Sequence, residues 1–325
     1  MFTPAPLRRL LALLLVAAGA SALRAEELVL RVGFFPNITH AQGVIGSETT
    51  REGHGWFEQR LGPGVSVHWF AFNAGPSAME ALFANSIDLT YVGPSPALNA
   101  YVRSAGDEVR ILAGSAEGGA ALVVAADGPI HQAADFKGRR IATPQLGNTQ
   151  DIAARCWLKR QGFKVTLTGG DVTVLPIANA EQLPLFKRGY VDAVWTVEPW
   201  VSRLVKDGGG RVYLEQKDAV ATILVASAAF LKFHPDLAAR FRAAHVELTA
   251  WVNANPAKAQ KLVADGLGAA TGRKTPVASV AAAWGRVRFT DTVVPAQLTA
   301  LVADAQSVGF LRDAIPLDLL FPRVP

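Results

Sequence analysis

The sequence predicts an α/β fold of two lobes with a cleft between them and a helical C-terminal region packed on the first lobe. Segments rich in β-branched and aromatic residues alternate with segments of helical periodicity, and they do so in two successive sets. Such alternation favours a mostly parallel sheet with helices on both faces. We expect residues 26–118 to form the first part of lobe I, residues 119–222 to form lobe II, and residues 223–325 to return to lobe I.

Short apolar runs between turn signals mark the individual elements. In the first set we expect strands at 28–35, 65–72, 87–92 and 110–114, with helices near 40–50, 76–85 and 96–104. In the second set we expect strands at 121–125, 139–143, 172–176 and 191–195, with helices near 149–161 and 180–188. The chain has no low-complexity linker, so we expect the hinge at short crossings near 116–122 and 220–226.

The C-terminal part reads as helical from Pro235 almost to its end. Within 235–254, apolar positions recur three or four residues apart, which places them on one face of a helix. These positions are Leu237, Phe241, His245, Leu248 and Val252.

Residues 1–25 resemble a secretory signal peptide. Arg8 and Arg9 precede an apolar run, and small residues follow it, with Ala22 and Ala25 as candidate cleavage positions. The apolar run is short for a membrane span, although an uncleaved anchor is the alternative. We expect cleavage, and we expect no lipid anchor because no cysteine ends the segment.

Composition is typical of a packed globular protein, with 50% hydrophobic and 18% charged residues among 325. The formal charge is +5; without the three arginines of residues 1–25, 29 basic residues face 27 acidic ones, a net charge of +2. This near balance argues against a nucleic-acid partner. The single cysteine, Cys156, excludes an intrachain disulfide, and its place on a predicted helix indicates a buried position.

The sequence carries no recognisable catalytic set. It contains no G-x-S-x-G nucleophile motif, and its six histidines are scattered without an H-E-x-x-H pair. We therefore expect neither an enzyme nor a bound metal or cofactor.

Five strand-to-helix loops carry residues that start helices. We expect Thr39 to cap a helix, with Gln42 completing a capping box. We expect Gly75 to cap the helix that Pro76 opens, and Ser95 to cap the helix that Pro96 opens. In lobe II we expect Asn148 and Asn179 to be helix caps. Free N–H groups at helix starts favour anions, and these loops place no Lys or Arg between strand and helix. They predict a cleft that holds an oxyanion such as a sulfonate or nitrate, and the alternative is ordinary capping. The candidate ligand-binding residues here are Asn37, Thr39, His40, Gly75, Pro76, Gly93, Ser95, Asn148 and Thr149.

A further strand end, Trp195–Glu198, adds two candidates. Trp195 would pack on an apolar part of the ligand, and Glu198 would accept a hydrogen bond or orient a neighbour. The alternative is that Trp200 is a core residue and Glu198 caps the helix that follows Pro199.

The motifs at residues 33–41, 55–58, 73–82, 87–93, 135–142 and 192–200, taken in this order, carry a family resemblance. The chain resembles the periplasmic substrate-binding proteins of ABC importers in the aliphatic sulfonate, taurine and nitrate group, which share a fold with thiamine-precursor binders. The resemblance implies a type II periplasmic binding fold that closes around a small anionic solute and delivers it to a membrane permease with its ATPase. It also implies ligand contacts at the same loops of both lobes.

From the residues and the resemblance together we expect a monomeric, periplasmic solute-binding protein that captures an aliphatic sulfonate or taurine by hinge closure. The alternatives are a nitrate, bicarbonate or thiamine-precursor binder of the same fold, or a ligand sensor. An enzyme on this fold is disfavoured, because the similar fungal thiamine-pyrimidine synthases carry a cysteine-rich motif and this chain has only Cys156.

Overall fold

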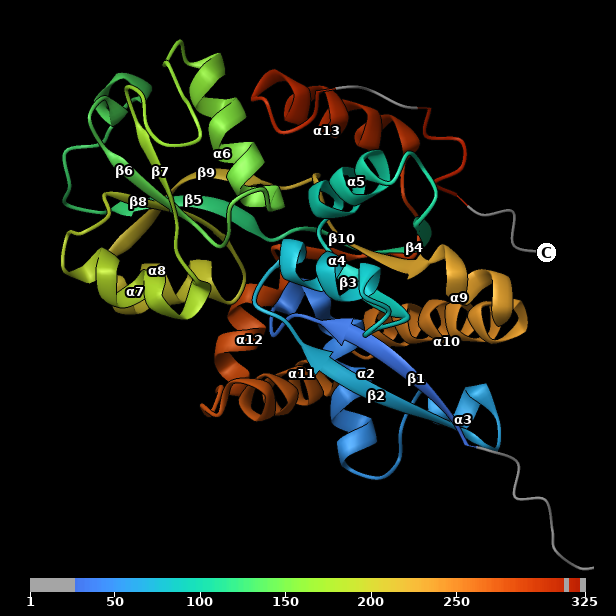
Figure 1. The fold of residues 1–325 in the computed structure, drawn as a ribbon. Coiled ribbons are helices and arrows are strands. Elements are labelled where there is room, and N and C mark those ends of the chain that lie inside the picture. Colours follow the sequence, from blue (N-terminus) through green and yellow to red (C-terminus); the bar gives the residue numbers. More distant parts are fainter. Residues whose placement is uncertain (1–26, 313–315, 322–325) are drawn as a thin grey trace, which may run out of the picture.

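The computed structural model describes residues 27–312 and 316–321, so the predicted signal at 1–25 lies outside the described residues. Two separate sheets form the cores of two lobes, which confirms the predicted fold class (Figure 1). The sheet of lobe I has the strand order β11-β4-β10-β3-β1-β2, and the sheet of lobe II has the order β7-β6-β8-β5-β9.

The strands lie close to the predicted runs. Lobe I contains β1 (Leu28–Phe34), β2 (Val65–Ala71), β3 (Leu89–Val92), β4 (Val109–Gly118), β10 (Val220–Ser227) and β11 (Val287–Phe289). Lobe II contains β5 (Ala120–Ala125), β6 (Arg140–Thr143), β7 (Thr173–Pro176), β8 (Ala193–Val197) and β9 (Gly210–Gln216). Sequence reasoning missed β9 and β11.

The expectation of mostly parallel sheets is wrong. β1 pairs in parallel with β2 and β3, but β10 runs antiparallel to both β3 and β4. In lobe II, β5 runs antiparallel to β8 and β9. The reason is the path of the chain: β4 leads out of lobe I and β10 leads back into it, so the returning strand opposes the outgoing one.

The helices cover both faces of each sheet. Around the lobe I sheet lie η1 (Ile38–His40), α2 (Ala41–Arg51), α3 (Glu58–Leu61), α4 (Gly75–Phe83), α5 (Pro94–Arg103), α9 (Ala228–Phe233), α10 (Pro235–Ala254), α11 (Pro256–Thr271) and α12 (Val277–Trp284). Lobe II carries η2 (Ala133–Phe136), α6 (Thr149–Arg160), α7 (Asn179–Lys187) and α8 (Trp200–Gly208).

Four apolar clusters, two in each lobe, hold these layers together. On one face of the lobe I sheet, β1 packs against α2, α10, α11 and α12; on the other face lie α4, α5 and α13 (Pro295–Ser307). The predicted apolar face of α10 is confirmed, since all five of its positions are buried. In lobe II, one cluster lies under α6 and the other under α7 and α8.

Two short crossings connect the lobes. The first lies between β4, which ends at Gly118, and β5, which begins at Ala120. The second lies between β9, which ends at Gln216, and β10, which begins at Val220 and belongs to the lobe I sheet. Hinges between lobes are usually a few residues at the ends of elements, and both crossings are segments of this kind.

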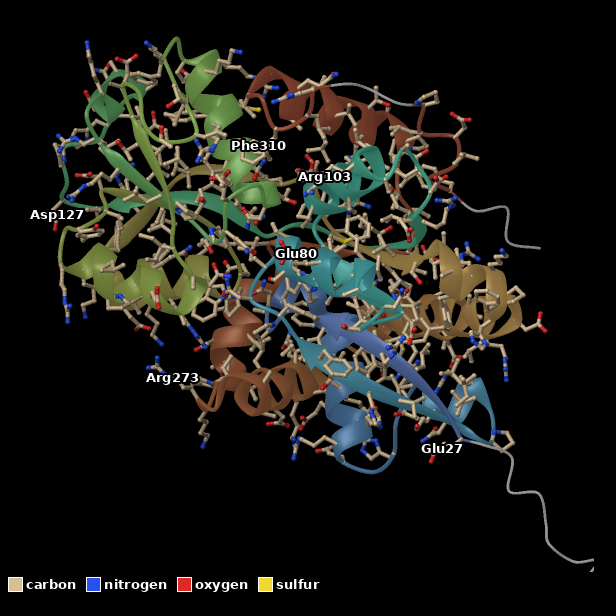
Figure 2. The ribbon with its side chains drawn as sticks, in the orientation of Figure 1. Glu27, Glu80, Arg103, Asp127, Arg273 and Phe310 are labelled. Carbon is tan, nitrogen blue, oxygen red and sulfur yellow. The ribbon has the colours of Figure 1, made fainter. Side chains whose placement is uncertain are left out.

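The last long helix departs from the expected packing. The C-terminal helices were expected on lobe I alone, but α13 contacts both α5 of lobe I and α6 of lobe II, and Figure 1 shows it across the top of the two lobes. Asp304 of α13 pairs with Arg160 of α6. Phe310, labelled in Figure 2, lies near Gly147 and the guanidinium of Arg155. Sequence periodicity shows that a helix has an apolar face, but it does not show which neighbours cover that face.

Within the part of the chain that the structure describes, every helix is too short or too polar to cross a membrane.

Candidate functional site

A small cavity lies where the two lobes meet, with a volume of about 20 Å³. A volume of this size corresponds to one or two water molecules. Residues of both lobes form its wall. Those of lobe I are Phe35, Asn37, Thr39, His40, Asn73, Ala74, Gly75, Gly93, Pro96 and Ala221, and those of lobe II are Pro144, Asn148, Thr149, Gln150, Asn179 and Val197.

Helix starts of both lobes meet at this cavity. The helices α4, α6 and α7 begin at Gly75, Thr149 and Asn179, and all three of these residues line it. The first N–H groups of a helix have no partner within the helix, and the helix dipole is positive at this end. Several dipoles therefore converge on one small volume from opposite sides.

The predicted capping pattern holds only in part. Asn148 caps α6 as expected, since its side-chain oxygen accepts from the backbone N–H of Asp151 at 2.8 Å. Thr39 forms no capping box, because Gln42 bonds instead to Ser115 and Thr249 in the core of lobe I.

Three helices are capped one or two residues earlier than expected. The N-caps of α4, α5 and α7 are Ala74, Gly93 and Ala178, without a side-chain capping bond. Pro94 starts α5, so Ser95 lies inside the first turn. Local sequence identifies a helix start to within one or two residues, and backbone geometry decides the rest.

Three amide side chains in the wall are oriented by the protein so that their NH₂ groups are free to donate. Asn37 Oδ1 accepts from the indole Nε1 of Trp200 at 2.8 Å, which can only donate. Gln150 Oε1 accepts from Asn148 Nδ2 at 3.1 Å, and Asn179 Oδ1 accepts from Thr196 Oγ1 at 2.9 Å. Since the side-chain oxygen of each amide already accepts a hydrogen bond, the NH₂ group of each amide is the donor that remains.

His40 adds a neutral donor. Its Nδ1 accepts from the backbone N–H of Phe35 at 3.4 Å, and its ring stacks on Phe35 with centroids 4.3 Å apart. Burial lowers the pKa of His40 to about 3, so the ring is neutral at physiological pH. With Nδ1 as acceptor, the proton lies on Nε2, which is then a donor.

The lobes touch directly beside the cavity. The backbone N–H of Ser95 donates to Thr149 Oγ1 across the lobes at 3.3 Å, and the N–H of Ile38 donates to the carbonyl of Glu198 at 3.0 Å. A Cβ atom on Gly93 would lie 2.4 Å from Thr149 Oγ1, so this close approach requires glycine at position 93. The two lobes are therefore in direct contact beside the cavity.

Charge is absent from the wall. Among residues 27–312 and 316–321, no Asp, Glu, Lys or Arg side chain lines this cavity. The same described ranges hold no cluster of three or more His, Cys, Asp and Glu residues arranged to hold a metal ion. The site thus offers neutral donors and helix dipoles, which suit an anion that needs hydrogen bonds more than a salt bridge.

Trp195, which was predicted to pack on a ligand, does not line this cavity. Trp195 is buried in the core of lobe II, where its Nε1 donates to Gln216 Oε1 at 3.0 Å and its ring packs edge-on against Trp157. Along β8 it is Val197, two positions further, that reaches the cavity. Strand length alone did not show where along the strand the cleft begins.

Glu198 makes the contacts of the capping alternative, and it does not line the cavity. Its carboxylate accepts from the N–H and the hydroxyl of Ser202, at 3.1 and 3.0 Å, in the first turn of α8. Arg286 of lobe I lies 3.6 Å from it, so the residue also links the lobes. Burial raises the pKa of Glu198 despite these partners. The same alternative placed Trp200 in the core, but Trp200 is partly buried and its Nε1 donates to Asn37.

Two more candidates do not line the cavity. Pro76 lies in the first turn of α4 and Ser95 in the first turn of α5. The hydroxyl of Ser95 is buried, and in the part of the chain that the structure describes it has no hydrogen-bond partner. The candidates that do line the cavity are Asn37, Thr39, His40, Gly75, Gly93, Asn148 and Thr149.

Sequence reasoning did not select Asn73, Gln150, Asn179 or Ala221, which also line the cavity. The first three stand in the loops that it singled out, so the signal was present in their amide side chains. Ala221 carries no such signal, because an alanine at a strand start is common everywhere.

A curated relative shares part of this sequence. A putative aliphatic sulfonates-binding protein of Escherichia coli (strain K12) is 29% identical over 209 residues, covering 63% of this chain and 60% of the relative. The match therefore spans less than two thirds of that relative's length. The relative is named for binding, in agreement with the expectation that this chain is not an enzyme.

Solved structures share the fold over almost the whole chain. The alkanesulfonate-binding protein SsuA from Xanthomonas axonopodis pv. citri bound to MOPS is 22% identical, with a TM-score of 0.71 over 92% of this chain and 96% of that one. The periplasmic nitrate-binding protein NrtA from Synechocystis PCC 6803 is 16% identical, with a TM-score of 0.75 over 91% of this chain and 84% of that one. At such identities the likeness establishes the periplasmic binding protein fold.

A family model assigns most of the chain. The model of the NMT1-like family matches residues 24–265, which include both sheets except β11 and all the residues that line the cavity. The chain therefore belongs to the NMT1-like family.

Proposed function

We propose that this protein is the extracytoplasmic solute-binding component of an ABC importer and that it captures a small anion between its two lobes. Capture, hinge closure and presentation to a membrane permease constitute the function, and the ligand leaves chemically unchanged. The proposal rests on the interlobe cavity, which neutral donors and helix starts line. Among the described residues, no charged side chain lines this cavity.

The chemistry of the wall favours an oxyanion over other solutes. The free amide groups of Asn37, Gln150 and Asn179 and the Nε2–H of His40 are donors, which a cation could not use. A sulfonate or a nitrate keeps its charge at every physiological pH and offers three oxygens to accept from such donors. The relative named for aliphatic sulfonates and the neighbour bound to MOPS, itself an organic sulfonate, support the sulfonate class.

Within this class we favour an unsubstituted aliphatic sulfonate over taurine. The ammonium group of taurine needs acceptors or a carboxylate, and the described residues place no acidic side chain in the wall. Nitrate is the second candidate, because the cavity of about 20 Å³ suits a small oxyanion and a neighbour is named for nitrate.

We also propose that the chain is exported to the periplasm with residues 1–25 removed as a signal peptide. The support is the pattern of Arg8, Arg9, the apolar run and the small residues after it. N-terminal sequencing of the mature protein should find a start near Leu23 or Glu26 in the soluble periplasmic fraction. Full-length protein in the membrane fraction would contradict export in this form.

Ligand screening tests the proposed function directly. Melting temperatures of the mature protein should rise with methanesulfonate, ethanesulfonate or nitrate, and stay unchanged with tetramethylammonium. A ligand at a hundred times its Kd stabilises the folded state by about 2.7 kcal/mol. NMR of the recovered ligand should show it unchanged. A cation that stabilises the protein, or turnover of a bound sulfonate, would contradict the proposal.

A matched pair of variants locates the ligand. Asn179→Asp replaces a donor in the wall by a carboxylate, and it should weaken sulfonate binding by about a hundredfold, the cost of one hydrogen bond to a charged group. Asn99→Asp introduces the same charge on α5 outside the cavity wall and should leave the Kd unchanged. Equal losses in both variants would point to a general charge effect.

A further inference from the structure

A buried ion pair lies in α6, the helix whose start forms part of the cavity wall in lobe II. Asp151 and Arg155 are four residues apart, and their side chains are 0% and 1% exposed. Arg155 Nε donates to Asp151 Oδ2 at 3.0 Å, and a second guanidinium nitrogen donates to Oδ1 at 3.2 Å. A buried pair of this kind usually stabilises a fold no better than apolar residues of similar size, so stability alone does not account for it.

Asp151 stands next to the candidate site. It lies in the first turn of α6, directly after Thr149 and Gln150, and both of these residues line the interlobe cavity. A carboxylate at a helix start is attracted by the same positive end of the dipole that would hold an anionic ligand. An unpaired charge on Asp151 would therefore repel an anion from this helix start.

The same carboxylate fixes the loop that leads into α6. Its Oδ2 accepts from the N–H of Gly147 at 3.0 Å, and its Oδ1 accepts from the hydroxyl of Thr143 at 2.9 Å. Asn148 caps the N–H of Asp151, so the two N–H groups that precede it in α6 are left without a helical partner. The loop thus needs an acceptor at position 151, where an anion site disfavours a negative charge.

The guanidinium of Arg155 is held by lobe II and does not line the interlobe cavity. One of its NH₂ groups donates to the carbonyl of Thr166 at 2.6 Å, and the ring of Phe310 lies 5.9 Å from its central carbon. Arg155 therefore acts on the cavity only through Asp151 and through its own charge. In buried surroundings such a charge is less screened than at the surface.

We propose that Arg155 is a positioning residue of the anion site, which neutralises Asp151 so that this carboxylate holds the loop without repelling the ligand. The inference rests on the proposed function. With the two charges balanced, the field at the start of α6 is that of the helix dipole, which favours an anion.

Asp151→Asn tests the sign of the effect. Asparagine keeps an oxygen for the N–H of Gly147, and the hydroxyl of Thr143 can turn to accept from the new NH₂ group. The charge of Arg155 is then unbalanced, so the Kd of the mature protein for methanesulfonate should fall about tenfold by calorimetry, the effect of a unit charge about 10 Å away at an effective dielectric constant of about 20. A purely structural role of the pair predicts weaker binding instead.

Arg155→Gln should have the opposite effect. It leaves the carboxylate of Asp151 unbalanced, and at pH 8 the Kd for methanesulfonate should rise about tenfold. The double variant Asp151→Asn/Arg155→Gln has no net charge at this place, as in the parent, and its Kd should return to within about threefold of the parent value.

Asp88→Asn is the matched control in lobe I. The carboxylate of Asp88 also accepts from a backbone N–H and from a guanidinium, both of Arg31, at 2.8 and 2.6 Å, and neither residue lines the cavity. The Kd of this variant should equal that of the parent.

Weaker binding by both single variants, without recovery in the double variant, would overturn the inference and leave the proposed function standing. Where only one single variant folds, the direction of its change decides: an unchanged or higher Kd in Asp151→Asn, or an unchanged or lower Kd in Arg155→Gln, contradicts the charge balance. If the parent binds neither methanesulfonate nor nitrate, the proposed function itself fails, and the inference falls with it.

Discussion

The indole Nε1 of Trp200 on α8 donates a hydrogen bond of 2.8 Å to the side-chain oxygen of Asn37 in the loop after β1. The bond joins the two lobes, and it also determines which end of the Asn37 amide faces the cavity. Since indole can only donate, the NH₂ group of Asn37 is left as a donor toward the site. One contact thus joins the two lobes and also sets the polarity of the candidate site.

Trp200→Phe keeps the ring and removes this donor. The Asn37 amide then loses its fixed orientation, and the closed state loses one interlobe hydrogen bond worth about 1 kcal/mol. We expect the Kd for a sulfonate to rise about fivefold, measured by calorimetry, with little change in the melting temperature of the unliganded protein.

Trp56→Phe is the matched control for that variant. It also removes an indole hydrogen bond, from Nε1 to the carbonyl of Ala244 at 3.1 Å, but within lobe I and away from the cavity. It should lower stability and leave the Kd unchanged. A Kd that is the same in Trp200→Phe and the parent would refute the role of Asn37.

Gly93→Ala should act as a wedge between the lobes. The added methyl would lie 2.4 Å from Thr149 Oγ1 of the other lobe, and the φ of Gly93, −65°, is ordinary for alanine. Overpacking of this kind costs about 1–3 kcal/mol, here only in the closed state. We expect calorimetry to show a Kd weakened by about tenfold or more.

The unliganded melting temperature of Gly93→Ala should stay near that of the parent. Gly285→Ala provides the comparison, because a Cβ there meets nothing within 4 Å and the φ is again ordinary, −67°. It should affect neither property. Unimpaired binding by Gly93→Ala would mean that the ligand is held without the close contact between Gly93 and Thr149.

Ligand affinity should be nearly independent of pH from about pH 8 to about pH 5. The donors in the wall are neutral amides and helix N–H groups, and burial holds the pKa of His40 at about 3, so its ring does not titrate in this range. Calorimetry at several pH values measures this. A site that depended on a charged histidine would instead lose affinity as the pH rises through about 6.5.

Stability, in contrast, should fall as the pH drops. The pKa values of His40 and His245 are lowered by burial to about 3 and about 4. Below about pH 6.5 the unfolded chain binds a proton at each histidine that the folded protein does not, so each costs about 1.4 kcal/mol per pH unit. The loss begins near pH 6.5 and ends where each folded pKa is reached.

His40→Gln tests this assignment by urea denaturation across the same range. The variant should show a shallower pH dependence, smaller by the contribution of one histidine, because glutamine does not titrate. An unchanged slope would show that His40 can take up a proton while the protein stays folded.

Ser95→Ala separates a structural hydroxyl from a ligand-binding one. The hydroxyl of Ser95 is buried and has no hydrogen-bond partner among the described residues. Removing such a group should be neutral or should stabilise the unliganded protein by up to about 1 kcal/mol, and the Kd should not change. A weakened Kd at an unchanged melting temperature would instead show that the ligand supplies the missing partner.

The sequence by itself determined the two-lobed α/β class and the loops that line the candidate site. Alternating periodicities and the residues that begin helices are local properties, so they could be recognised without knowing which strands pair. The cap at Asn148 and the buried face of α10 are local in the same sense, and both were predicted correctly.

Only the tertiary structure decided what each side chain in those loops faces. Trp195 and Val197 stand on one strand, but the position of the cleft relative to β8 places the first in the core and the second in the wall. Asn37 is a donor because Trp200, distant in sequence, engages its oxygen. α13 contacts α6 of lobe II as well as α5 of lobe I, which its own apolar periodicity did not indicate. These features depend on contacts between segments far apart in the chain, and local sequence patterns do not record such contacts.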